Sequence, residues 1–341
     1  IHGVLTVAAD VPLTVATVAH RLGLPGIPME AARLAQDKLA MKVRFAEAGI
    51  PVPWFAAVPS PDALKWMVDE RGFDLVIKPV DSRGSRGVQR LSPDTDLKAA
   101  WEITAGHSLT GRVMAEAYLT GPQISTESIL LNGEGYTPGF SDRNYELLDR
   151  YAPFFVENGG DLPSRLPQIF QYAVKRMAEQ AGRAMGIRTG NIKGDMVLHD
   201  GKPHVIELAA RASGGYFCTH EIPLNTGVDF VGSIVKLAVG EAVTPDELKP
   251  KFIRPVVQRY LFPEPGRILS VNGETRARAM PGVETLIVTA KPGDILRKPE
   301  HAGCTAAMVL TTGASVAEAR ARAEAALNAI DVRTAPQVDA A

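Results

Sequence analysis

The stretch that decides the fold is Val76-Ile-Lys-Pro-Val-Asp-Ser-Arg-Gly-Ser-Arg-Gly87. The β-branched, alternating residues before it predict a strand over residues 73–79, and the glycines and serines predict a loop over residues 81–87. Lys78 therefore stands at the end of a buried strand, directly before a loop whose backbone N–H groups can approach a ligand closely. Such a loop, with the donors of Ser and Arg, suits a phosphate. A tight hairpin with a solvated lysine is the alternative for this segment taken alone.

The composition excludes several classes of protein. The chain has 341 residues, of which 45% are hydrophobic and 22% charged, and this excludes intrinsic disorder. The 37 basic residues balance 38 acidic ones, so neither nucleic acid nor a charged membrane surface is indicated as a partner. No apolar run is long enough for a spanning helix. Cys218 and Cys304 form no disulfide framework, and with no signal-peptide pattern we expect a cytoplasmic protein.

The first residues resemble the end of a larger unit. Ile1 is not Met, so we expect further chain upstream of it. Residues 2–8 predict a buried strand and residues 15–22 a helix, with turn chemistry over residues 23–28. One strand and one helix cannot form a stable domain alone, so we expect them to pack on the rest of the protein.

Two acidic residues flank a predicted hairpin turn. Strands over residues 194–199 and 204–209 are joined by Asp200-Gly201, and Asp195 and Glu207 lie on facing strands. Two carboxylates on one sheet face repel each other unless a cation lies between them, and Mg²⁺ prefers oxygen ligands that it shares with nucleotide phosphates. Arg211 and Ser213-Gly-Gly215 follow, offering a fixed positive fork and an open backbone. Unrelated acids on an exposed hairpin are the alternative.

Other segments carry weaker signals when taken alone. Residues 113–119 predict a strand that ends on Glu116-Ala-Tyr-Leu119, with Glu127 on the next strand. A strand end can bind an adenine edge through its backbone, although an ordinary strand explains the same residues. Lys38, at the start of a helix that Asp37 caps, would by itself be a solvated lysine.

In combination these segments resemble the ATP-grasp superfamily, in the branch of biotin carboxylase and carbamoyl-phosphate synthase. The resemblance covers roughly residues 35–215 and rests on residues 37–42 and 49–53, 76–87, 116–119 and 205–211. It implies an α+β fold in which two α/β subdomains clamp ATP. The implied domains are residues 1–36 as the end of a truncated N-terminal lobe, residues 37–254 as the ATP-grasp domain with a mobile lid over about 57–117, and residues 255–341 as a C-terminal lobe.

The resemblance also implies roles for individual residues. Lys38 and Lys78 match lysines that contact the ATP phosphates, and Ser82, Gly84, Ser85 and Gly87 match the loop of the lid. Glu116, Ala117, Tyr118 and Leu119 match the segment that binds adenine, Glu127 matches a ribose contact, and Leu208 belongs to the same nucleotide site. Asp195 and Glu207 match Mg²⁺ ligands, with Mn²⁺ as an allowed substitute. Arg211 matches the arginine beside the acyl phosphate. Apart from the resemblance, Lys193 precedes Asp195 on the same strand face, so we expect that it can reach the substrate.

One departure from the family pattern concerns the metal. The family commonly has Asn two residues after the second acid, where this chain has Ala209. The number of bound metal ions therefore stays open between one and two.

The implied activity is that of an ATP-dependent carboxylate–amine ligase. It would act on small-molecule carboxylates and amines through an acyl phosphate and release ADP and phosphate. A homodimer is compatible with the resemblance. Two alternatives stay open, namely a carboxylase or carbamoyl-phosphate synthase-like activity and a nucleotide-binding regulatory protein without turnover.

Overall fold

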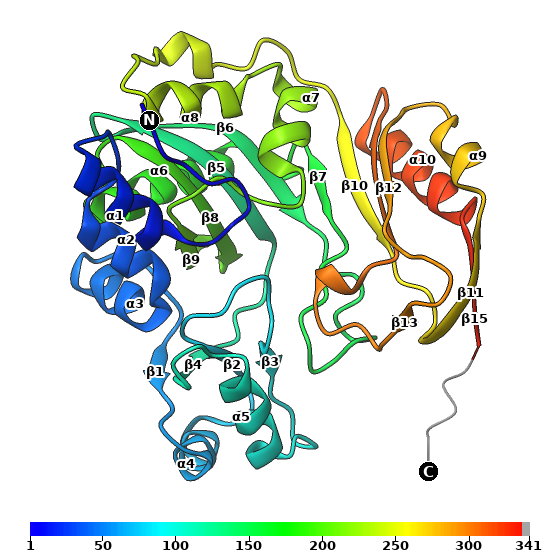
Figure 1. Cartoon of the computed structure of the whole chain (residues 1–341). Coiled ribbons are helices and arrows are strands. Elements are labelled where there is room, and N and C mark those ends of the chain that lie inside the picture. Colours follow the sequence, from blue (N-terminus) through cyan, green and yellow to red (C-terminus); the bar gives the residue numbers. More distant parts are fainter. Residues whose placement is uncertain (336–341) are drawn as a thin grey trace.

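The computed structural model describes residues 1–335 and shows a mixed helix-and-sheet protein built around one large antiparallel sheet (Figure 1). This sheet has eight strands in the order β12-β14-β10-β7-β6-β5-β8-β9. In chain order the strands are β5 (Gln123–Leu131), β6 (Glu134–Arg143), β7 (Gly160–Leu162), β8 (Gly190–His199), β9 (Lys202–Ala209), β10 (Val256–Leu261), β12 (Val283–Val288) and β14 (Ala307–Thr312).

Two tight turns set the register of the strands that matter most. Asn132 and Gly133 join β5 to β6, and Asp200 and Gly201 join β8 to β9; all four have positive φ angles of 49° to 92°. Two-residue turns of this kind match the right-handed twist of the flanking strands. Both hairpins were predicted from the sequence and are confirmed. In the second one, a β-bulge between Met196 and Asp195 shifts the register by one residue and brings Asp195 directly opposite Glu207.

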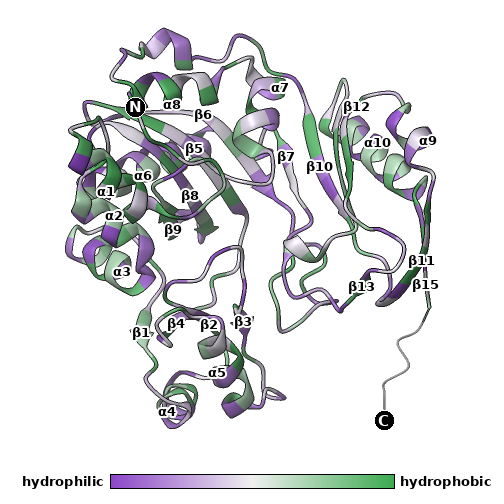
Figure 2. Ribbon diagram, viewed as in Figure 1, coloured by the Kyte–Doolittle hydropathy of each residue, from purple (hydrophilic) through white to green (hydrophobic). Residues whose placement is uncertain are grey.

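Helices cover one face of the large sheet. The long helix α6 (Gln168–Ala184) packs on strands β5, β6, β8 and β9, and α3 (Lys38–Glu47) lies beside it. The core between these layers contains Phe45, Val174 and Ile192, which are fully buried. Figure 2 shows this concentration of apolar residues on the strands of the large sheet. Helix α3 begins at the predicted cap, because the Asp37 side chain accepts a hydrogen bond from the backbone of Ala40 at 2.9 Å.

A smaller α/β unit lies below the large sheet in Figure 1. Its four strands have the order β1-β4-β2-β3. They are β1 (Phe55–Ala57), β2 (Leu75–Pro79), β3 (Gln89–Arg90) and β4 (Val113–Ala117), and the helices α4 (Pro61–Arg71) and α5 (Leu97–Gly106) complete the unit. The sequence predicts α4 with the same bounds, and Ser60 caps it as its hydroxyl accepts from the backbone N–H of Ala63.

The last part of the chain is joined to the large sheet. Strands β10, β12 and β14 extend that sheet, while a second small sheet has the order β13-β11-β15. The remaining elements here are β11 (Gly266–Asn272), α9 (Glu274–Arg278), β13 (Ile295–Leu296), a 3₁₀ turn (Ala302–Cys304), α10 (Val316–Asn328) and β15 (Asp331–Ala335). Between β9 and β10 the chain forms a π-helical turn (Phe217–Glu221), α7 (Ile222–Thr226), α8 (Phe230–Ala238) and a 3₁₀ turn (Pro245–Leu248). The domain bounds expected from the sequence stay a prediction.

The N-terminal segment differs from the prediction. Residues 2–8 form no strand; Val7 makes one isolated parallel bridge to Ala212, whose carbonyl accepts from the backbone N–H of Ala8. Helix α1 (Pro12–Leu22) is close to the predicted helix, but α2 (Met29–Gln36) was not predicted. Helix α2 is stable because Ala31, Ala32 and Leu34 bury one face against the rest of the protein. None of the helices within residues 1–335 is long and apolar enough to span a bilayer.

A buried ion-pair cluster fastens the C-terminal strands and helix to the large sheet, and it provides a test of the fold. Asp161 on β7 lies 2.9 Å from Arg259 on β10 and also pairs with Arg320 on α10. The side chains of Asp161 and Arg259 are each 3% exposed. Asp161→Asn leaves Arg259 buried without its counter-charge, so we expect a loss of about 3 kcal/mol in unfolding free energy, seen as a lower urea midpoint.

Asp331→Asn is the matched control, because Asp331 pairs with Arg333 at the exposed surface. We expect no measurable shift of the midpoint for this variant. Equal midpoints for the two variants would contradict the structural role of Asp161.

Candidate functional site

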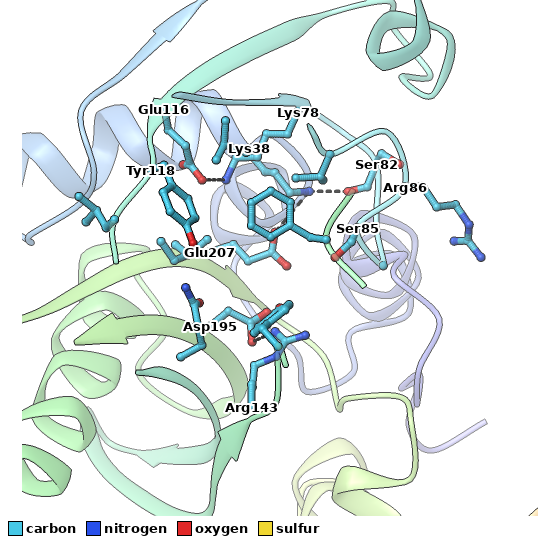
Figure 3. Close-up of a pocket in the computed structure, with 18 of the residues that line it drawn as sticks. Lys38, Lys78, Ser82, Ser85, Arg86, Glu116, Tyr118, Arg143, Asp195 and Glu207 are labelled. Atoms are coloured by element: carbon cyan, nitrogen blue, oxygen red, sulfur yellow. Dashed lines mark hydrogen bonds and ion pairs between the residues drawn. The ribbon is translucent and has the colours of Figure 1, made fainter. Parts of the chain in front are cut away.

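A cleft lies between the small α/β unit and the large sheet. Figure 3 shows side chains from both converging on it. Lys78, Glu116 and Tyr118 come from the small sheet or its strand ends, Lys38 from the start of α3, and Asp195 and Glu207 from the β8–β9 hairpin. Residues that are far apart in the sequence thus surround one space.

A buried charge cluster holds Lys78 in place. Its ammonium donates to Glu116 Oε1 at 2.6 Å, and Lys42 Nζ lies 3.0 Å from Glu116 Oε2. Burial works to raise the pKa of Glu116, but Lys42 and Lys78 outweigh it and hold that pKa below its usual value. Burial lowers the pKa of Lys42 to about 8, which Glu116 partly opposes. Glu116 is therefore a fixed anion whose carboxylate orients Lys78 toward the cleft.

Lys42 was not predicted from the sequence to belong to this cluster. It is 1% exposed and also donates to the carbonyl of Val205 on β9 at 3.0 Å. The sequence did offer one signal for this role: Lys42 lies on the apolar face of a predicted helix, and an ammonium buried there requires an acidic or carbonyl partner.

The paired carboxylates lie on the floor of the cleft. Asp195 accepts from Ser125 at 2.8 Å and from Arg143 at 2.7 Å, and it also contacts Lys193. Burial tends to raise its pKa, yet Arg143 and Lys193 hold the pKa below the usual range. Glu207 lies 3.5 Å from Lys38, and its pKa is also lowered, against the effect of burial. Both groups are therefore ionised at neutral pH.

Two ionised carboxylates directly opposite each other fit a divalent cation with oxygen ligands. Within residues 1–335 there is no cluster of three or more His, Cys, Asp and Glu side chains that could hold a metal ion. These two carboxylates alone leave most of an octahedral shell open, which suits an ion that also takes phosphate oxygens and water.

The loop over residues 82–87 covers the cleft. Lys38 donates to the carbonyl of Ser82, and Ser82, Gly84 and Ser85 line the space. Gly84 and Ser85 have φ angles of 62° and 58°, a conformation that turns successive backbone groups toward one side. Gly87 does not line the cleft; the side chain of His107 packs against it.

An apolar side of the cleft can accept a flat ring. Ala117, Tyr118 and Leu119 line it where β4 ends, as the sequence predicted. The Tyr118 ring lies 6.2 Å from that of Phe155, and Arg90 lies over the Tyr118 ring at 4.0 Å. These contacts fix the ring at the mouth of the cleft.

Two predicted nucleotide contacts lie elsewhere. Leu208 is buried in the core, and its backbone N–H points to the Met41 sulfur. Glu127 is fully buried outside the cleft and accepts from the Ser213 N–H at 3.0 Å. Glu127 was expected to contact the ribose, but its side chain points to the backbone of Ser213, which follows β9, and does not line the cleft. Burial raises the pKa of Glu127 to about 8, against the hydrogen bond from Ser213.

A second cavity adjoins the first. Its volume is about 490 Å³, and Arg83, Gly84, Arg86 and Arg143 line both spaces. Lys193, Arg211 and the backbone of Ser213-Gly-Gly215 line the second one. Arg211 Nε lies 3.3 Å from Asp10, and Arg143 bridges Asp195 and Glu157. The two residues predicted to act in catalysis thus line the second cavity, and Lys193 also contacts Asp195 of the carboxylate pair.

The fold and the cleft define a nucleotide-binding clamp made of two α/β units. Residues 35–215 match the ATP-grasp domain family, and residues 259–335 match the L-amino acid ligase C-terminal domain 2. The chain therefore belongs to the ATP-grasp family, as the motifs predicted.

Relatives of known sequence agree with this assignment. A D-alanine–D-alanine ligase of Cupriavidus metallidurans is 29% identical over 207 residues, covering 57% of this chain and 61% of the relative. An uncharacterized protein of Sinorhizobium fredii is 26% identical over 298 residues, covering 86% of this chain and 60% of the relative. The chain thus spans about three fifths of the length of these curated relatives.

Solved structures share the fold. The crystal structure of an L-amino acid ligase from Bacillus licheniformis has a TM-score of 0.83 at 21% identity, covering 98% of this chain and 81% of that one. The crystal structure of a biotin carboxylase–beta-gamma-ATP complex from Campylobacter jejuni has a TM-score of 0.67 at 18% identity, covering 95% of this chain and 73% of that one. The expected α+β clamp is confirmed.

The position of Glu127 generates a prediction about stability and pH. A carboxyl with a pKa of about 8 in the folded protein, against 4.5 ordinarily, binds more protons when folded than when unfolded. Its contribution to stability is full below about pH 4.5 and is lost as the pH rises through about 8. Glu127→Gln mimics the neutral form, so the variant should gain stability relative to the wild type as the pH rises.

Urea midpoints of the two proteins at pH 5, 7 and 8.5 test this. The exposed Glu102 on α5 gives the control variant Glu102→Gln, whose difference from the wild type should stay constant. A pH-independent difference for Glu127→Gln would show that Glu127 is ionised in the folded protein.

Proposed function

We propose that the protein is an ATP-dependent carboxylate–amine ligase that acts through an acyl phosphate and releases ADP and phosphate. The observation that carries this proposal is the convergence of Lys38, Lys78 and the Asp195–Glu207 pair on one cleft, which continues into a cavity lined by Arg211 and Lys193. The amino acid ligases among the relatives support the same reaction class.

In this proposal the first cleft holds the nucleotide. The adenine lies at Tyr118 and Leu119, and the phosphates lie between Lys38, Lys78 and the backbone of the loop at Gly84. Mg²⁺, held by Asp195 and Glu207, would supply neutralisation of the phosphate oxygens. The clamp thus binds and orients the nucleotide with its terminal phosphate toward the second cavity.

The second cavity holds the carboxylate and the amine. A carboxylate oxygen attacks the terminal phosphorus in line, the bond to the bridging oxygen breaks, and ADP leaves. The amine nitrogen then attacks the acyl carbon, phosphate leaves, and the nitrogen loses a proton. Arg211 and Lys193 supply positive charge beside the developing anions, and the loop over residues 82–87 excludes water that would hydrolyse the acyl phosphate.

In this proposal Arg143 is a positioning residue that orients the metal-binding carboxylate of Asp195. It donates to Asp195 at 2.7 Å and pairs with Glu157 in the second cavity, so one side chain connects the two spaces. Its fixed fork keeps Asp195 aligned opposite Glu207.

The test is Mg²⁺-dependent release of ADP with pooled amino acids and small carboxylates. We expect stimulation by an amino-acid pool.

Glu207→Gln should lower the rate at least about 100-fold, since it removes one of two anions that hold the cation, while nucleotide binding persists. Lys78→Ala should weaken nucleotide binding about tenfold or more through loss of a charged hydrogen bond. Glu102→Gln is the control and should retain full activity.

Other outcomes would point elsewhere. Stimulation by bicarbonate alone would indicate a carboxylase-like or carbamoyl-phosphate synthase-like enzyme. Tight nucleotide binding without turnover on any pool would indicate a regulatory protein. Wild-type turnover by Glu207→Gln would remove Glu207 from the metal site.

A further inference from the structure

The second cavity contains a carboxyl group that the proposed reaction does not use. Glu221 ends the π-helical turn after β9, is 3% exposed, and lines the cavity. Among residues 1–335 no group forms a hydrogen bond or an ion pair with its carboxyl group, and its oxygens are not among the fully enclosed ones, so the carboxyl group faces the cavity without a protein partner.

The groups around Glu221 are already paired with one another. Glu157 pairs with Arg143, and Asp161 pairs with Arg259 and Arg320. The Tyr260 hydroxyl donates to Gln258 at 2.8 Å, and Gln258 donates in turn to the carbonyl of Gly215. The acids nearest to Glu221, Glu157 and Asp161, are thus the partners of Arg143, Arg259 and Arg320, and these cations are committed to them rather than to Glu221. The same cavity is also lined by Arg83, Arg86, Lys193 and Arg211.

This environment sets the protonation of Glu221. Burial, followed by repulsion from Glu157 and Asp161, raises its pKa well above the usual value, and the attraction of Arg259 only partly opposes this. The neighbouring Tyr260 has its own pKa raised by burial, so it stays a neutral hydroxyl. The protein's own groups therefore favour the protonated form of Glu221, and a cation beside it would favour the ionised form.

We propose that Glu221 is a cation-binding, specificity-determining residue of the second cavity, and that a substrate of the enzyme places an ammonium or guanidinium group against it. This rests on the proposed ligase function. A buried site that pairs with a charged group strongly rejects an analogue without it, because the protein group is then left unpartnered. The cavity volume of about 490 Å³ accommodates a small molecule that carries both a carboxylate and a cation.

Binding of a cation should then release a proton. Below its raised pKa the Glu221 carboxyl carries a proton; a bound cation forms an ion pair with the carboxylate, and the proton passes to the buffer. Affinity for a cationic substrate should consequently rise with pH below the pKa of the substrate's own cation. A neutral analogue should show neither effect.

Calorimetry with the full chain, Mg²⁺ and a non-hydrolysable ATP analogue tests this with three probes. Arginine carries both cations, citrulline lacks the side-chain cation, and Nα-acetylarginine lacks the α-ammonium. Loss of affinity of about 10- to 100-fold for citrulline assigns the guanidinium to Glu221, and the same loss for Nα-acetylarginine assigns the α-ammonium. Equal affinity for all three, or no binding by any of them, overturns the proposal.

Glu221→Gln isolates the carboxylate. We expect the preference for the cationic probe to vanish, its affinity to fall about 10- to 100-fold, and proton release, measured in two buffers of different ionisation enthalpy, to disappear. Glu221→Asp should restore part of the preference and of the proton release, which a purely structural residue would not do. Glu102→Gln should behave as the wild type. An unchanged preference in Glu221→Gln overturns the proposal.

The two proposals fail separately. ADP release that an amino-acid pool stimulates, together with a probe preference that Glu221→Gln leaves unchanged, would retain the ligase and remove the cation site. Cation binding that depends on Glu221, without ADP release on any pool, would retain the cation site and remove the ligase.

Discussion

The buried pairing of Glu116 with Lys42 and Lys78 is the interaction on which the clamp depends. It joins four segments, because Lys42 comes from α3, Lys78 from β2, Glu116 from β4, and the carbonyl that also accepts from Lys42 lies on β9. Each of these charges alone would be costly to bury. Together they hold the small α/β unit against the large sheet, so the same contacts that join the units also aim an ammonium into the cleft.

The rest of the site follows from strand register. The Asp200–Gly201 turn sets the register from His199 to Met196, and a β-bulge between Met196 and Asp195 then shifts it by one residue. Without this bulge Asp195 would lie opposite Ile206 rather than Glu207. The turn and the bulge together therefore determine whether the floor of the cleft carries two facing carboxylates for a divalent cation.

Local patterns predicted much of this from the sequence. The capped helix over residues 61–71, both two-residue hairpins and the lysine before the loop have short-range signals, and the structure contains them. The patterns could not predict which side chains, far apart in the sequence, pair with each other in the fold. Lys42 and Arg143 appear in the sequence as one helical and one strand cation, and only the packed fold shows that they complete Glu116 and Asp195. Helix α2 was missed because the buried faces of Ala31 and Leu34, rather than its own propensity, stabilise it.

Glu127 shows why a family pattern does not replace geometry. Its register opposite Lys193 follows from the β5–β8 pairing, yet the side chain ends against the backbone of Ser213 rather than in the cleft. There its buried carboxyl anchors the segment Ser213-Gly-Gly215, which lines the second cavity. Two carboxyl groups with raised pKa values, Glu127 and Glu221, thus lie on either side of the segment from Ser213 onward. Glu127 Oε1 accepts from a backbone N–H and so holds the wall of the cavity in place, whereas the Glu221 carboxyl group faces the cavity and is left for a cation of the ligand to pair with.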